Sequence, residues 1–168
     1  MLTDDLFEHW ILLLEELDII NQMYLYAVSK NGMPRDVSLA FAVELAEPMA
    51  EILVARKKLP ANTRRQTLKE CLEALPVEYD NVVFYKETSA DSDGFLDKLK
   101  NNRVRIMHIK HNQKKEKCFD GAHCVLYLCK LSLLYRSIPL GLFDISACAY
   151  KGKLKMNAAA LDAWAENL

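Results

Sequence analysis

Apolar residues recur at intervals of three and four along most of the chain, which is the period of an α-helix with one buried face. The pattern is continuous from Phe7 to Val28 and predicts a first helix of about seven turns that begins near Thr3. Gly32 and Pro34 follow it, and a glycine with a proline just beyond is typical of a helix C-terminus. We therefore expect one uninterrupted N-terminal helix.

Two further helices are predicted before residue 77. The first begins near Asp36 and ends at Leu59, with a kink at Pro48, because proline lacks a backbone N–H and its ring crowds the preceding turn. The second is short, is capped by Thr63 and stops at Pro76.

Residues 77–93 carry the weakest signal. The run from Val82 to Tyr85 has the composition of a strand, but one short strand without a partner does not make a sheet. We expect a packed, partly helical connection here, followed by a helix that Asp91 or Ser92 caps and that ends near Asn112.

The last third of the chain predicts a central helix and a short one. Asp120 is expected to cap the central helix, and Pro139 and Gly141 to end it. Its apolar residues surround the helix axis, which is typical of the most buried helix of a bundle: Val125, Leu126, Tyr127, Leu128, Leu131, Leu133 and Leu134. Asn157 is expected to cap the last helix. The whole pattern predicts an all-α fold, a multi-helix bundle of about six helices forming a single domain over residues 1–168.

Composition narrows the class of protein. No apolar run reaches the length of about 20 residues that a membrane span needs, and the N-terminus lacks the basic start of a signal peptide. The five cysteines include no C-x-x-C pair, which favours reduced thiols over a disulfide framework. We therefore expect a cytoplasmic protein without a membrane partner.

The net charge of −1 hides an uneven distribution. Residues 1–51 hold ten Asp/Glu and two Lys/Arg, whereas residues 94–117 hold eight Lys/Arg and two Asp/Glu. Two interpretations are open: the basic segment faces a polyanion, or the acidic and basic helices face each other in the fold.

The basic segment also contains the best candidate for chemistry, an arginine and a histidine in the spacing R-x4-H, Arg103 and His108. Histidine transfers protons near neutral pH, and arginine stabilises charge on a phosphate. Residues five apart on a helix point about 140° apart, so the pair needs a folded-back arginine, a helix end near His108, or a second copy of the helix. Alternatively, Arg103 is paired to an acid such as Glu44 and His108 merely ends the helix.

A metal site is the weaker candidate. His108, His111, Cys118, His123 and Cys124 are possible zinc ligands, but their spacing matches no known zinc pattern. Cys124 and Cys129 fall in the apolar helix, where cysteine is usually a small core residue. We expect no metal and no cofactor.

The segment from Asn102 to His108, followed by a polar connection, an apolar helix and the turn Pro139-Leu140-Gly141, resembles HEPN domains. It is most similar to the Apea-like group, which carries an arginine, a histidine after a short spacing and then a leucine-rich helix. The stretch from Leu13 to Leu17 is also similar to that group's first helix. The resemblance covers about residues 6–142, so residues 143–168 are expected to form a short C-terminal extension.

The resemblance implies a helical homodimer in which two copies of the motif helix form one site. The implied activity is metal-independent endoribonuclease cleavage through attack by the RNA 2′-hydroxyl, in toxin–antitoxin systems or antiviral defence, with an antitoxin or a larger defence protein as a possible partner. Arg103 and His108 are then the catalytic pair. The residues expected to bind flanking nucleic acid are Asn102, Arg105, Lys110, His111, Lys114 and Lys115.

One position departs from the family pattern. Val104 stands where the family has a polar residue after the arginine. It favours the alternative, a catalytically inactive HEPN-like bundle that binds RNA, a nucleotide or a partner protein.

Overall fold

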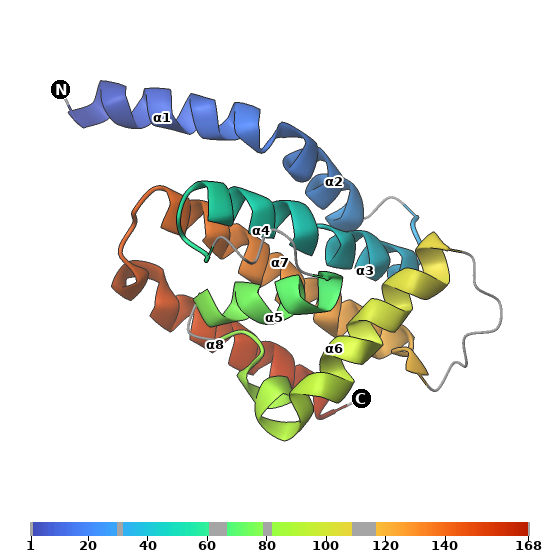
Figure 1. Ribbon diagram of the computed structural model, residues 1–168. Helices are drawn as coiled ribbons and strands as arrows, with labels where there is room; N and C mark the ends of the chain where they lie inside the picture. The colour runs from blue at the N-terminus through green and yellow to red at the C-terminus, as the bar shows by residue number, and fades with distance from the viewer. Residues whose placement is uncertain (1, 30–31, 61–66, 79–81, 109–116, 168) are drawn as a thin grey trace.

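A computed structural model of the chain describes residues 2–29, 32–60, 67–78, 82–108 and 117–167 (Figure 1). These residues form helices and contain no strand, which confirms the predicted all-α fold. The helices are α1 (Leu2–Glu16), α2 (Asp18–Val28), α3 (Arg35–Glu44), α4 (Ala46–Ala55), α5 (Leu68–Glu78), α6 (Tyr85–Met107), α7 (Gly121–Leu142) and α8 (Ala147–Ala165). Within the bundle α3 packs against α2, α6 and α7, α4 against α5, α5 against α6, and α7 against α8.

The prediction of one uninterrupted N-terminal helix was wrong. The helix breaks at Leu17, a buried residue with φ −90° and ψ 3°. After the break α2 packs against α3, whereas α1 runs along the outside of the bundle (Figure 1). As a result α1 leaves large apolar side chains in solvent; Phe7 is 65% exposed and Trp10 46%. Trp10 stacks on Phe143, with ring centroids 5.0 Å apart.

The kink expected at Pro48 is confirmed, and it divides the predicted helix into two, with Leu45 between them. α3 ends at Glu44, and α4 begins at Ala46. The break falls where proline predicts it, because Pro48 has no N–H to donate to the carbonyl of Glu44 and its ring crowds that turn. This break places the Glu44 side chain at the C-terminal end of α3.

The helix that carries the R-x4-H motif begins earlier than predicted and is itself kinked. α6 starts at Tyr85. The strand-like run from Val82 to Tyr85 therefore forms a turn that leads into the first residue of this helix. Asp91 interrupts α6 with φ −161° and ψ 85°, and its Oδ1 accepts a hydrogen bond from the Gly94 N–H at 3.0 Å. Asp91 was one of two predicted caps, and the structure confirms it.

The third predicted helix and the last two differ from prediction at their ends. Thr63 lies outside the described residues, and α5 passes Pro76 to reach Glu78. Asp120 caps α7 as expected, accepting from the His123 N–H at 2.9 Å. α7 continues through Pro139 to Leu142 and ends only where Asp144 takes the left-handed conformation, with φ 55°.

α8 begins at Ala147, well before the predicted cap at Asn157. It buries Leu154 and Ala158 against the bundle, and Leu154 belongs to the hydrophobic core.

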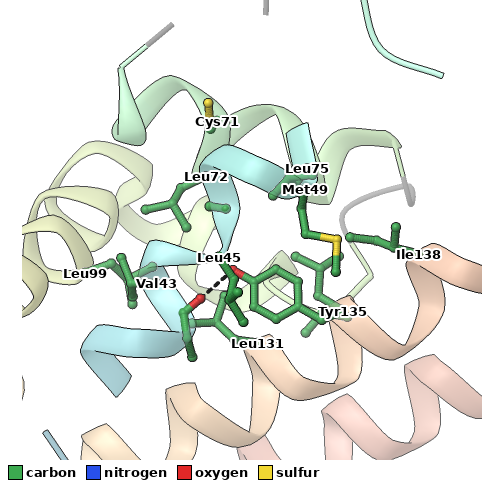
Figure 2. Close-up of a cluster of buried hydrophobic side chains, with 14 of the residues drawn as sticks. Val43, Leu45, Met49, Cys71, Leu72, Leu75, Leu99, Leu131, Tyr135 and Ile138 are labelled. Carbon is green, nitrogen blue, oxygen red and sulfur yellow. Dashed lines mark hydrogen bonds between the residues drawn. The ribbon is translucent and has the colours of Figure 1, made fainter. Parts of the chain in front are cut away.

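The centre of the core lies between α3, α4, α5, α6 and α7 (Figure 2). Tyr135 of α7 is 3% exposed and donates its hydroxyl to the Ala42 carbonyl at 2.7 Å. That carbonyl lies in the last turn of α3, where a helix leaves carbonyls without helical partners. Burial raises the pKa of Tyr135, so the phenol stays protonated and keeps donating.

α7 is long and apolar enough, by length and composition, to cross a membrane. Half of its apolar stretch is nevertheless buried inside this bundle, and Lys130 in that stretch forms ion pairs. These features are typical of the core helix of a folded domain.

The Asp91 cap makes a specific demand on residue 94. A Cβ added to Gly94 would lie 2.1 Å from Asp91 Oδ2, so Gly94→Ala must displace the cap. We expect this change to destabilise the fold by about 1 kcal/mol, the usual value of a cap, as measured by urea unfolding. In the Asp91→Ala background the same change should cost little, because the clash is gone. Gly152→Ala is the control, since nothing lies within 4 Å of its added Cβ; equal effects of Gly94→Ala in both backgrounds would contradict this account.

Candidate functional site

Arg103 and His108 lie together at the C-terminal end of α6. Arg103 Nη1 is 3.1 Å from His108 Nε2. The helix ends at Met107, and His108 adopts φ −105° and ψ 6°, so its side chain leaves the helical course and meets the arginine. Of the three arrangements open from sequence, the helix end near His108 is the one observed. One chain therefore brings the pair together.

Glu44 holds the other side of the Arg103 guanidinium. Arg103 Nε donates to Glu44 Oε2, and Nη2 donates to Glu44 Oε1 at 3.0 Å. Two parallel hydrogen bonds between arginine and a carboxylate fix both the position and the plane of the guanidinium. The alternative that pairs Arg103 with Glu44 is thus also observed, and the two contacts coexist on one side chain.

The electrostatics of this cluster keep Arg103 charged. The hydrogen bond to Glu44 raises the pKa of Arg103, partial burial opposes the rise, and the charges of Glu44 and Glu47 add to it. A guanidinium only donates, so His108 Nε2 accepts in their contact, which fits the neutral imidazole protonated on Nδ1. His108 is exposed, while the Arg103 side chain is 20% exposed, so the cluster opens to solvent on the histidine side.

Asn102 does not lie where a nucleic acid could reach it. It is 2% exposed; its Oδ1 accepts from the Phe119 N–H at 2.8 Å, and its Nδ2 donates to Cys124 Sγ at 3.3 Å. The expected contact of Asn102 with nucleic acid is therefore corrected to a structural role: its amide joins the end of α6 to the start of α7. Arg103, the next residue, is held in place by this attachment.

The other predicted contacts are divided between described and undescribed parts of the chain. Arg105 is partly exposed near the end of α6. Nearby, Lys100 and Lys117 are exposed, and Lys98 Nζ lies 5.8 Å from the centre of the Phe119 ring. The remaining predicted residues lie outside the described residues: Lys110, His111, Lys114 and Lys115.

Two of the possible zinc ligands, His123 and Cys124, have other contacts. The Nδ1 of His123 is 2.9 Å from Asp120 Oδ1, and the Cys124 thiol lies within 3.7 Å of the Phe119 carbonyl oxygen, to which it donates. Burial raises the pKa of the Cys124 thiol. Within the described ranges no three His, Cys, Asp or Glu side chains gather as a metal site would require.

Ion pairs join several helices of the fold, and one of them, Arg103 with Glu44, joins the basic segment to the acidic one. Arg56 pairs with Glu16, Arg103 pairs with Glu44, and Lys69 contacts Asp93 and Asp97 at 2.9 and 3.1 Å. Part of the uneven charge distribution is therefore used inside the fold. Lys100 and Lys117 have no ion pair with a described residue, so positive charge remains near His108.

A second charged cluster was missed from the sequence. Lys130, in the middle of α7, is fully buried, and its Nζ lies 2.6 Å from Glu87 Oε1 and 2.6 Å from Asp162 Oδ1. The ammonium also lies 5.9 Å from the centre of the Phe84 ring. The signal that could have found it is a single lysine in an otherwise apolar run, since a buried charge requires partners.

Comparison of the chain with known protein families, with curated proteins and with solved structures finds no match.

Removal of the buried ammonium should leave two partly buried carboxylates, Glu87 and Asp162, without their partner. We expect Lys130→Met to lower the free energy of unfolding by about 3–5 kcal/mol, the usual cost of breaking a buried ion pair. Lys86→Met is the matched control, because the Lys86–Glu166 pair lies on the surface, and its unfolding midpoint should stay near that of the wild type. Chemical denaturation followed by circular dichroism measures both; a Lys130→Met protein as stable as the wild type would show that the cluster adds nothing.

Proposed function

We propose that this chain is a metal-independent endoribonuclease of the HEPN type, active in the cytoplasm as a homodimer in toxin–antitoxin or antiviral defence. The observation that carries the proposal is the contact of Arg103 Nη1 with His108 Nε2 at 3.1 Å, on the exposed end of α6. The R-x4-H spacing of HEPN domains is the second support. Positive charge on Arg105, Lys100 and Lys117 around this end suits a phosphate backbone.

The proposed reaction needs one base and one cation. A phosphate oxygen that accepts from Arg103 Nη1 takes the place of the imidazole nitrogen there and frees His108 Nε2. His108 then removes the proton of the 2′-hydroxyl, the 2′-oxygen attacks the adjacent phosphorus, and the bond to the 5′-oxygen breaks. The guanidinium stabilises the charge that develops on the phosphate oxygens. The products are a 2′,3′-cyclic phosphate and a 5′-hydroxyl, whose proton comes from an imidazolium.

A homodimer through the motif helix belongs to the same proposal. In-line displacement places the attacking and leaving oxygens on opposite sides of the phosphorus, and two copies of His108 would serve both. Val104, Ile106 and Met107 are partly exposed at the end of α6, so apolar surface is present for such a contact. The ion pair with Glu44 compensates the charge of Arg103 within one chain, so the arginine does not itself require a second subunit. The proposed dimer is supported by the in-line geometry of the reaction and by this apolar surface.

The second candidate function is a binding module without catalysis. The bidentate pair with Glu44 favours it, because a carboxylate that already neutralises Arg103 competes with a phosphate. Val104 at the position after the arginine favours it as well. In this case the exposed cations bind RNA, a nucleotide or an acidic partner and leave it intact.

Cleavage of labelled RNA in excess chelator tests the first candidate. We expect cleavage to persist, because the nucleophile is the RNA's own hydroxyl, and the products to end in a 2′,3′-cyclic phosphate. His108→Ala should abolish cleavage, and Arg103→Lys should reduce it at least about 100-fold, because an ammonium does not reproduce the planar guanidinium. DNA should not be cut, since it lacks the 2′-hydroxyl.

Two controls separate the candidates. Lys114→Ala should weaken RNA binding and lower its salt dependence by about one ion without abolishing cleavage. Equal cleavage by wild type and His108→Ala would identify a contaminating nuclease. RNA that binds without being cut, together with a monomer in sedimentation at tens of micromolar, would favour the binding module.

Glu44 should act as a positioning residue for Arg103. In Glu44→Gln the guanidinium loses its charged partner, so phosphate is bound more tightly while the geometry loosens. We expect KM to fall and kcat to fall about 10- to 100-fold. Glu47→Gln is the matched control, because Glu47 adds charge near Arg103 without a described hydrogen bond to it. If the variant merely contained less folded protein, kcat would fall and KM would stay the same. An unchanged kcat would show that Glu44 has no positioning role in the reaction.

A further inference from the structure

One side of α7 faces an open groove of about 600 Å³. Its floor is formed by α7 residues that repeat at intervals of three and four from Val125 to Arg136. The sequence predicts burial around the whole of this helix, but only Leu128 on this side is buried, and Val125, Cys129 and Leu133 are partly exposed. The groove therefore holds apolar surface that the described fold leaves uncovered.

The walls come from three other helices. Val28 ends α2, Arg35 begins α3, and α8 contributes Asn157, Ala160 and Leu161. α8 lies beside α7 along this side (Figure 1). The volume falls in the range of small-molecule sites, which combine an apolar lining with a few polar groups.

Among the described residues that line the groove, the charged ones are two arginines, Arg35 and Arg136. Arg136 Nε donates to the Tyr24 hydroxyl at 2.7 Å, and that hydroxyl lies 2.6 Å from Ser132 Oγ. No Asp or Glu is among the residues that line the groove, and no described carboxylate pairs with Arg35 or Arg136. Arg103 differs, since a glutamate takes two of its nitrogens. Both groove guanidiniums thus have donors available to a ligand.

Cys129 connects the apolar floor to these charges. Burial raises the pKa of the Cys129 thiol, and the positive charges of Arg35 and Arg136 oppose the rise. Arg35 and Arg136 line the same groove as Cys129. The cations and the apolar surface belong to one site.

We propose that this groove binds a small amphipathic anion. Its apolar body lies against Leu128, Leu133 and Leu161, and its carboxylate or phosphate accepts hydrogen bonds from Arg35 and Arg136. The planar guanidinium matches two oxygens of either head group. Because the described lining residues include two arginines and no Asp or Glu, the groove favours an anionic over a cationic amphiphile.

Isothermal titration of the intact chain with decanoate, decyl phosphate and 1-decanol tests the head group. We expect one site per chain for an anion and binding at least about tenfold weaker for decanol, because hydrogen bonds to charged groups are worth that much. The tighter of decanoate and decyl phosphate identifies the natural head group as carboxylate or phosphate. Decanol binding as tight as the anions, or no anion binding at millimolar concentration, would overturn the proposal.

Matched variants locate the site. Arg35→Met should weaken decanoate binding about tenfold, and Ala160→Phe should block it by filling the groove without changing charge. Lys153→Met and Ala163→Phe are the controls, because both residues are exposed on α8 and neither lines the groove. Equal affinities in all four variants would place any observed binding elsewhere.

Alkylation of Cys129 gives a readout that does not depend on affinity measurements. In a Cys148→Ser background, which removes the exposed cysteine, iodoacetamide should modify Cys129 before the buried thiols. Saturating decanoate should slow this modification several-fold in peptides measured by mass spectrometry, and Ala160→Phe should slow it without ligand. Unchanged alkylation under saturating decanoate would contradict occupancy of the groove.

Discussion

The missing N–H of Pro48 is the constraint on which much of this structure depends. It prevents a hydrogen bond to the Glu44 carbonyl, so α3 ends at Glu44 and a new helix begins. The Glu44 side chain, at this end of α3, pairs with Arg103 on α6. The carbonyls of the last turn of α3 also need partners, and Tyr135 supplies one to Ala42 from the centre of α7. A single imino acid thus helps to connect α3 to both α6 and α7.

The candidate site balances two demands on one guanidinium. Glu44 orders Arg103 and partly neutralises it, while His108 occupies the remaining Nη1. Catalysis requires a guanidinium held in a fixed position, whereas phosphate binding requires its positive charge. The contact with Glu44 affects both the position and the charge of Arg103. The hydrogen bond from the Phe119 N–H to Asn102 Oδ1 ties the end of α6, which carries the pair, to the segment before α7. Substitution of Glu44 alone therefore distinguishes its effect on the position of the Arg103 guanidinium from its effect on the charge of that group.

The sequence predicted the features that local rules govern. The all-α class, the break near Pro48 and the caps at Asp91 and Asp120 follow from periodicity and from hydrogen bonds within a few residues. The errors arose where tertiary packing decides. The bend at Leu17, the continuation of α7 past Pro139 and the burial of Asn102 depend on neighbours that are distant in sequence. Lys130 could be flagged from its apolar surroundings, but its partners, Glu87 and Asp162, could not be chosen without the fold.

The position of Asp162 has a consequence for how the chain acquires its structure during synthesis. The ribosome releases Glu87 and Lys130 well before Asp162, yet the buried ammonium contacts both carboxylates in the finished core. Until α8 emerges, closing the bundle around Lys130 would bury a charge with half of its compensation. The nascent chain is therefore expected to keep the middle of α7 hydrated and to complete its core late, with the last helix acting as the step that commits the domain to its native packing.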